Sequence, residues 1–187
     1  MEATTHTRSG GGICLPDEEK ELLQPDSVSV QGVNPDTNSG KVHVCVCICT
    51  FRRPVLLKRL LEALEKQQTE NAFTFSVVVA DNDCEQSAKQ AINDFSRGSP
   101  LQITYCNEPH QNIALARNMA LRKAWGHFVA FIDDDEFPID TWLLELHRAC
   151  LDFGADGVLG PVEPHFEAEP PPDWETRRRS PPTLRPL

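Results

Sequence analysis

The chain has 187 residues, a length that allows one domain with a hydrophobic core. Hydrophobic residues make up 40% of it and charged residues 25%, and the formal net charge is −10. This acidic balance argues against a general binder of nucleic acid or of anionic membranes. It permits a nucleotide ligand, because a metal ion can supply positive charge locally.

The two ends of the chain differ from its middle in composition, since the 15 prolines cluster toward them. Residues 1–40 are also poor in aromatic side chains, and we expect them to be disordered. Residues 165–187 combine prolines with a run of arginines, which predicts an irregular tail. A single globular domain is therefore expected over residues 41–164.

The seven cysteines form no CxxC pair, and Cys45, Cys47 and Cys49 alternate along one predicted strand. We interpret these three as buried thiols on one strand face, with a thiolate metal site as the alternative. The odd number of cysteines and the absence of a signal peptide indicate a reducing, cytoplasmic setting. No apolar run reaches the roughly 18–20 residues that span a bilayer, which leaves attachment at the inner face of the cell membrane open.

Strand and helix patterns alternate along the middle of the chain. Apolar runs predict strands at residues 42–49, 73–80, 101–106, 127–132 and 156–162. Amphipathic patterns predict helices at residues 54–68, 85–95, 113–125 and 138–153. Such alternation predicts an α/β fold, a three-layer α/β/α sandwich with a mainly parallel sheet.

Several residues are expected to set the limits and the buried face of these helices. Pro54 suits the first position of the first helix, and Gly126 and Gly154 suit left-handed ends of the third and fourth helices. The buried face of the first helix is expected to consist of its regularly spaced apolar residues, Val55, Leu57, Leu60, Leu61 and Leu64.

Polar side chains follow three of the predicted strands. Because parallel strands point the same way, these groups should meet at one edge of the sheet, where ligands bind in open α/β folds. The acidic run at the end of the fourth strand would repel itself unless a cation lay among its carboxylates. Mg²⁺ and Mn²⁺ prefer such oxygen ligands. The groups are Thr50 with Arg52 and Arg53, Asp81 with Asp83, and Asp133, Asp134, Asp135 and Glu136.

We therefore predict a metal site that holds a phosphate-bearing ligand. The alternative is a solvated acidic turn that caps the next helix. The sequence contains no GxGxxG after the first strand, no GxxxxGK[ST] and no GxSxG. These absences disfavour dinucleotide oxidoreductases, P-loop enzymes and hydrolases with a nucleophile elbow.

Four segments stand out in chain order: CICTFRRPVLLKRLLEALEKQ, FSVVVADND, QNIALARNMAL and GHFVAFIDDDEFP. Together they resemble the successive blocks of an inverting family 2 glycosyltransferase. The resemblance covers residues 42–164 and is similar in its finer features to bacterial exopolysaccharide and cell-surface sugar transferases. It implies a GT-A fold whose N-terminal half binds a nucleotide-sugar donor, with a UDP-sugar as the expected donor and a glycan or lipid-linked molecule as the expected acceptor.

The resemblance also implies roles for the acidic residues. Asp133 and Asp135 match the DxD pair, which in the family holds Mg²⁺ or Mn²⁺ on the donor diphosphate. Asp134 lies between them and is expected to contact the nucleotide sugar. Asp81, with Asp83 beside it, matches the acid that contacts the nucleoside base. The alternative for Asp81 and Asp83 is that they end a strand and cap a helix.

Basic and polar residues complete the pocket that the resemblance implies. Thr50 and Arg52 lie where the first loop of the family lines the nucleoside pocket. Arg117 and Asn118 match the ARN block beside the nucleotide. The alternatives are a solvated loop charge for Arg52 and surface or capping roles for Arg117 and Asn118.

The sequence departs from the family pattern where the acceptor half should follow. Inversion requires a carboxylate that takes the proton of the acceptor hydroxyl. After residue 162 the carboxylates lie within the proline-rich tail, and we find no acidic motif that suggests a general base. We therefore expect a truncated transferase that binds its donor without efficient transfer. The alternatives are a non-catalytic nucleotide-sugar-binding or regulatory module, or another metal-dependent nucleotidyl or phosphoryl enzyme.

Overall fold

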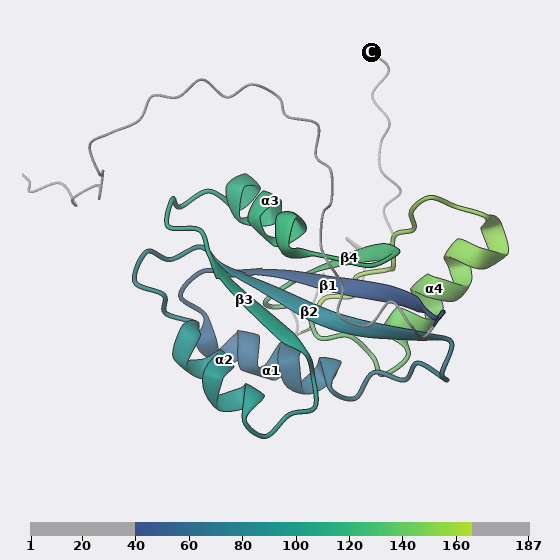
Figure 1. Ribbon diagram of the computed structural model, residues 1–187, viewed down its shortest axis with the longest axis horizontal. Coiled ribbons are helices and arrows are strands. Elements are labelled where there is room, and N and C mark those ends of the chain that lie inside the picture. Colours follow the sequence, from purple (N-terminus) through teal and green to yellow (C-terminus); the bar gives the residue numbers. More distant parts are fainter. Residues whose placement is uncertain (1–39, 166–187) are drawn as a thin grey trace, which may run out of the picture.

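A computed structural model describes residues 40–165 of the chain. The segments expected to be disordered or irregular, residues 1–39 and 166–187, lie outside the described residues. Strands and helices alternate throughout the described part (Figure 1). The strands are β1 (Val42–Thr50), β2 (Phe73–Asp81), β3 (Ile103–Asn107) and β4 (Phe128–Asp133). The helices are α1 (Pro54–Leu64), α2 (Lys89–Ser96), α3 (Ile113–Lys123) and α4 (Trp142–Phe153).

The four strands form one sheet in the order β3-β2-β1-β4, and every pair of neighbours is parallel. Helix α3 covers one face of the sheet, and α1 and α2 cover the other (Figure 1). Leu143 and Leu144 of α4 pack into the same apolar cluster as α1. The predicted three-layer sandwich with a parallel sheet is therefore confirmed.

Two apolar layers hold the sandwich together, and the period of two in β1 divides its side chains between them. Val44, Val46 and Ile48 pack toward α1 and α4. Cys45, Cys47 and Cys49 point the other way, onto the small residues Ala116, Ala120 and Ala124 at α3 and its end. Small side chains on both surfaces let the helix lie close to the sheet, and the prediction that the three thiols share one buried face is confirmed.

The first helix matches the prediction in its start and in most of its buried face. Pro54 occupies the first turn of α1, and the four leucines of the predicted stripe are all buried. Val55 is 80% exposed, so its assignment to the buried face is wrong. It lies in the first turn of α1, where no second element of residues 40–165 covers it.

The predicted fifth strand at residues 156–162 is also wrong, because this stretch has no regular structure. Leu159 and Val162 are exposed. Pro161 lacks an N–H to donate, and glycines at 157 and 160 weaken extended structure. Within residues 40–165, β4 therefore forms an edge of the sheet.

The two glycines that were expected to end helices differ in their outcome. Gly154 ends α4 in the left-handed conformation, with φ at 55°, as predicted. Helix α3 instead ends at Lys123, and Ala124 after it is already extended. Gly126 has φ at 119° because the turn there packs against the carbonyl of His43. Gly126 therefore allows the chain to pass close to His43 of β1, and it does not cap α3.

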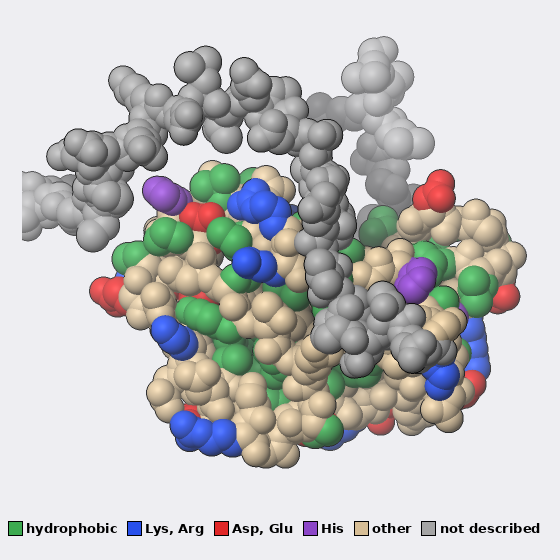
Figure 2. Space-filling model, in the orientation of Figure 1, with side chains coloured by type: hydrophobic (Ala, Val, Ile, Leu, Met, Phe, Trp, Pro, Cys, Tyr) green, Lys and Arg blue, Asp and Glu red, His purple; other side chains and the backbone are tan. Residues whose placement is uncertain are grey.

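In the described range 40–165, no helix is long and apolar enough to cross a membrane. On the face that Figure 2 shows, basic and acidic side chains are interspersed and do not gather in one patch of a single sign. The charges that matter for a ligand must therefore be sought locally, at the edge of the sheet where the polar strand ends meet.

Candidate functional site

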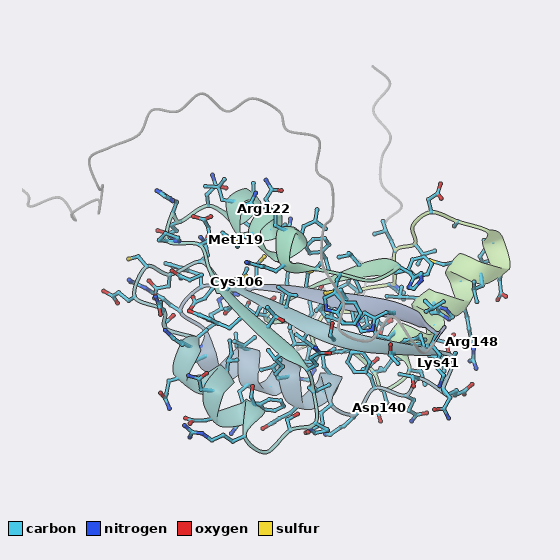
Figure 3. The ribbon with its side chains drawn as sticks, in the orientation of Figure 1. Lys41, Cys106, Met119, Arg122, Asp140 and Arg148 are labelled. Carbon is cyan, nitrogen blue, oxygen red and sulfur yellow. The ribbon has the colours of Figure 1, made fainter. Side chains whose placement is uncertain are left out.

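The polar ends of three neighbouring strands lie together at one edge of the sheet, as the sequence predicts. Thr50 at the end of β1 pairs with Asp81 at the end of β2. Cys49 pairs with Asp133 at the end of β4. In Figure 3, Lys41 marks the opposite, amino end of β1, and Cys106 lies near the carboxyl end of β3. The parallel register thus brings residues more than 80 positions apart in sequence to one rim.

A cleft of about 470 Å³ opens at this rim. Four segments line it: the turn after β1, the residue after the end of β2, the loop before α3 with the start of that helix, and the acidic turn after β4. Its lining residues are Cys49, Thr50, Phe51, Arg53, Asn82, Gln111, Asn112, Ile113, Arg117, Asp133, Asp134 and Asp135. An aromatic ring, amides, arginines and carboxylates thus surround one space, a combination typical of a site for a polar, charged ligand.

The three aspartates of the cleft have different environments. The Asp134 side chain is only 6% exposed, and its carboxylate accepts hydrogen bonds from Thr50 Oγ1 at 2.8 Å and Arg53 Nη1 at 3.1 Å. The side chains of Asp133 and Asp135 are 57% and 54% exposed. The protein therefore fixes the middle carboxylate and leaves the outer two open to the cleft.

Each outer carboxylate has one arginine as its partner. Arg117 Nη2, from α3, donates to Asp133 Oδ1 at 3.3 Å. Arg53 Nη1 donates to Asp135 Oδ2 at 3.0 Å while it also bonds Asp134. Ion pairs between half-exposed groups are weak and can exchange partners. The outer carboxylates are therefore the ones available to a ligand.

A second acidic cluster lies beside the cleft, at the end of β2. Asp81 is fully buried. Its carboxylate accepts hydrogen bonds from Asp83 N at 3.2 Å, Ala88 N at 2.9 Å and Tyr105 Oη at 3.2 Å. Burial raises the pKa of Asp81 despite these bonds. The Asp81 carboxylate thus ties the loop that leads into α2 to the end of β2.

Asp83 is buried as well and pairs with Arg52, whose Nε and Nη2 donate to it at 3.1 and 3.3 Å. Burial alone would raise the pKa of Asp83, but hydrogen bonds from Arg52 and from the Glu85 N–H outweigh it and lower this pKa. Arg52 has φ at 55°, a backbone conformation that residues other than glycine rarely adopt. This turn directs Arg52 to Asp83 and the following Arg53 into the cleft.

A family model described as "Glycosyl transferase family 2" matches residues 45–186, which is most of the chain. The chain belongs to glycosyl transferase family 2. The resemblance seen in the four sequence blocks is thereby confirmed.

Named relatives include polysaccharide enzymes of bacteria. The succinoglycan biosynthesis protein ExoM of Rhizobium meliloti is 39% identical over 125 residues, which are 67% of this chain and 40% of ExoM. The hyaluronan synthase of Pasteurella multocida is 26% identical over 132 residues, which are 70% of this chain and 13% of that enzyme. This family 2 chain thus spans well under half the length of these relatives.

Among solved structures, the chain is similar to S. aureus TarS 1-349 in complex with UDP-GlcNAc. The TM-score is 0.52 at 24% identity, over 66% of this chain and 37% of the TarS chain. At this identity the likeness by itself shows the shared GT-A-like fold alone.

The cleft of this family 2 chain contains only some of the residues that the sequence analysis proposed for the donor site. Thr50, Arg117 and the three aspartates line it. Arg52, Asp81, Asp83 and Asn118 are not among its lining residues, and Asn118 is an exposed residue of α3. The roles of these four in ligand binding stay predictions.

Several lining residues were given no role in the nucleotide-sugar pocket from the sequence. Arg53 was grouped with Thr50 and Arg52 at the end of the first strand, but no sequence signal separates the arginine of the cleft from its neighbour. Asn82 lies between Asp81 and Asp83, where its position at the strand end could have identified it. Phe51, Gln111 and Ile113 carry no pattern that distinguishes them from other loop residues.

Asn82 connects the end of β2 to the loop that precedes α3. Its side-chain amide donates to the carbonyls of Glu108 at 2.9 Å and His110 at 2.6 Å. Its Oδ1 accepts from the backbone N–H of Asn112 at 2.9 Å. Asn112 in turn caps α3 by accepting from Ala114 N at 2.9 Å. Asn82 thus fixes the wall of the cleft that α3 begins.

The residues of the cleft fit the predicted Mg²⁺ or Mn²⁺ in donor chemistry. Asp133 and Asp135 offer exposed carboxylate oxygens, which these ions prefer. Within the described residues, no group of three or more His, Cys, Asp or Glu side chains is placed to hold a metal. Mg²⁺ is commonly bound by one or two carboxylates together with phosphates of the substrate. A cation here would take its remaining ligands from a phosphate-bearing molecule and water.

Proposed function

We propose that the cleft binds a nucleotide-diphospho-sugar, with a UDP-hexose as the donor. The sugar would pass with inversion to a glycan or a lipid-linked acceptor. The observation that carries this proposal is the placement of two half-exposed carboxylates, Asp133 and Asp135, beside Arg53 and Arg117 in one cleft. Carboxylates and guanidinium groups together suit a diphosphate that arrives with a divalent cation.

Each residue of the cleft has a distinct task in this proposal. Asp133 and Asp135 would hold Mg²⁺ or Mn²⁺, which, when bound, stabilises the negative charge of the departing nucleotide diphosphate. Thr50 fixes Asp134 by its hydrogen bond of 2.8 Å and so keeps the acidic turn in place. The Phe51 ring and the amides of the cleft would contact the nucleoside.

The general base of an inverting transfer is not assigned to the aspartates of the cleft. That base must be free to take a proton from the acceptor hydroxyl. Asp134 is occupied by Thr50 and Arg53, and the two outer aspartates are assigned to the cation. The general base is therefore to be sought among groups other than these three aspartates.

The relatives support the choice of donor and pathway. ExoM is named for succinoglycan biosynthesis, another relative is a hyaluronan synthase, and TarS has been solved with UDP-GlcNAc. We accordingly propose a UDP-sugar donor and a role in polysaccharide biosynthesis. We also propose that the protein acts in the cytoplasm, at the inner face of the cell membrane, where a lipid-linked acceptor would be available.

Calorimetric titration of the chain with UDP-sugars, with and without Mn²⁺, tests the proposal. Wild type should bind in the presence of Mn²⁺, and Asp133→Ala and Asp135→Ala should each weaken this binding at least tenfold. Asp152→Ala removes an exposed carboxylate of α4 away from the cleft and is the matched control. Equal binding by wild type and both cleft variants would refute the donor site.

A product assay separates a transferase from a binding module that uses the same cleft. The chain is incubated with UDP-sugar, Mn²⁺ and added glycan or lipid-linked acceptors, and the release of UDP is followed. Acceptor-dependent release that is lost in Asp135→Ala would exclude a purely regulatory module.

A further inference from the structure

We infer that Arg53 is a donor-binding residue that alternates between two partners: it neutralises Asp135 when no cation is bound, and it contacts the donor diphosphate when one is. This inference rests on the proposed function. It assigns to Arg53 a task that the cleft geometry supports and that the neighbouring Arg52, paired with Asp83, is not placed to perform.

The cleft has an uneven balance of charge. Its lining contains three aspartates and two arginines, so that three negative and two positive charges leave one net negative charge. Without the arginines, adjacent carboxylates would repel one another. Arg53 and Arg117 therefore act as internal counterions of the acidic turn, each within 3.3 Å of an outer carboxylate.

Arg53 is anchored by two carboxylates at once. Its Nη1 contacts both the buried Asp134 at 3.1 Å and the half-exposed Asp135 at 3.0 Å. When Asp135 turns to a cation, Arg53 loses one partner and keeps the other. The buried Asp134, itself fixed by Thr50, then holds the guanidinium at the same place in the cleft.

The guanidinium of Arg53 carries more donors than the acidic turn uses. Arginine has five N–H donors in a planar fork that matches phosphate oxygens. In the structure its hydrogen bonds to the acidic turn all come from Nη1. The remaining donors are free of the acidic turn, and the side chain is 52% exposed. Arg53 can thus bind a diphosphate without leaving Asp134.

This exchange links the binding of the two ligands. A cation alone must compete with Arg53 for Asp135. Separating Arg53 from Asp135 costs free energy. A diphosphate that arrives with the cation offsets this cost, because it accepts hydrogen bonds from Arg53 in place of Asp135. By linkage, each ligand then strengthens the binding of the other by the same factor.

The test measures Mn²⁺ alone and UDP with Mn²⁺ as two separate equilibria on the full 187-residue chain. Free Mn²⁺ is followed by electron paramagnetic resonance, and UDP binding at saturating Mn²⁺ is followed by calorimetry. In Arg53→Ala, Mn²⁺ alone should bind up to about fivefold more tightly, because a weak competing ion pair is lost. UDP should bind about 10- to 100-fold more weakly, because a charge-assisted hydrogen bond is lost.

Two further variants make the result specific. Arg53→Lys keeps the positive charge but not the fork, so Mn²⁺ affinity should stay within about twofold of wild type while UDP affinity falls by less than in the alanine variant. Arg97→Ala removes an exposed arginine at the end of α2 that pairs with Asp94, and it should change neither affinity. Thermal unfolding of all variants verifies that each is folded.

The outcomes distinguish the inference from the function on which it rests. If wild type binds neither Mn²⁺ nor UDP, the proposed function fails and this inference falls with it. If wild type binds both and Arg53→Ala changes neither affinity, only the role of Arg53 is refuted. Equal weakening of both ligands in Arg53→Ala would also refute the exchange, because it would make Arg53 a general support of the fold.

Discussion

Thr50 and Asp134 join the ends of two strands: the hydroxyl of Thr50, which ends β1, donates to the buried carboxylate of Asp134 at 2.8 Å. The two residues are 84 positions apart in the sequence. This bond fixes the acidic turn relative to the central strand, and Arg53 adds a second bond to the same carboxylate. The position of both outer aspartates therefore depends on Thr50.

Replacing Thr50 by Val should destabilise the chain by about 1–3 kcal/mol, since a buried charged acceptor loses a donor. The free energy of unfolding from urea titration measures the effect. Thr104→Val on β3 is the matched control, because Thr104 is exposed and valine suits a strand. A Thr50→Val protein as stable as the control variant would show that Arg53 alone fixes Asp134.

Replacing Asn82 by Ala should loosen the wall of the cleft at the start of α3. The variant loses the two bonds to the carbonyls of Glu108 and His110 and the bond from Asn112 N. Hydrogen exchange of the Asn112 amide should become at least tenfold faster, and UDP binding should weaken.

Asn82→Asp serves as the control for that result. Aspartate keeps an acceptor for the Asn112 amide but lacks the N–H donors that the two carbonyls need. Protection of the Asn112 amide should therefore be retained more fully in Asn82→Asp than in Asn82→Ala. Equal loss of protection in both variants would show that the carbonyl contacts, and not the acceptor, hold the loop.

The sequence was sufficient to predict the fold because the strands at the centre are strongly patterned. The apolar runs that became β1, β2 and β4 are buried or paired along their whole length, and their parallel order places Thr50, Asp81 and Asp133 at one edge. The alternation of Cys45, Cys47 and Cys49 correctly indicated one strand face. These features depend on local periodicity, which a sequence displays directly.

Other features depend on tertiary contacts that no local pattern contains. The choice of Arg53 over Arg52 for the cleft follows from the left-handed backbone of Arg52. Val55 is exposed because no element within the described part of the chain covers it, although its helical spacing matches the buried leucines. The stretch at 156–162 has an apolar composition, but strand formation also requires a partner, and the described residues offer it none.

His43 predicts a loss of stability at mildly acidic pH. The ring is buried, stacks on Trp125 with 3.5 Å between ring centroids, and bonds the hydroxyls of Thr74 and Ser76. Burial, with a smaller contribution from His127, lowers the pKa of His43 to about 4. The unfolded chain, with an ordinary histidine pKa of about 6.5, then binds the proton more readily between these two values.

Because the unfolded chain binds the proton more readily, lowering the pH favours unfolding. The stabilising contribution of neutral His43 is complete above about pH 6.5 and is lost as the pH falls toward 4. Between pH 7 and pH 5 the free energy of unfolding should fall by about 2 kcal/mol from this group. Urea titrations at both pH values should show that His43→Gln lacks this part of the decrease and that His165→Gln, at an exposed site, retains it.

Gly126 should be the glycine least tolerant of substitution among those described. A Cβ at this position would lie 2.8 Å from the His43 carbonyl oxygen, and φ at 119° is unfavourable for any other residue. Gly126→Ala should therefore cost about 1–3 kcal/mol from backbone strain, with the steric contact adding to it. Gly98→Ala is the matched control, because Gly98 has no atom within 4 Å of such a Cβ and no positive φ. It should be neutral or stabilise by up to about 1 kcal/mol. Equal stability of the two variants in urea would show that the backbone at residue 126 can move away from β1 without loss. The stacking of His43 on Trp125 would then not depend on this close approach.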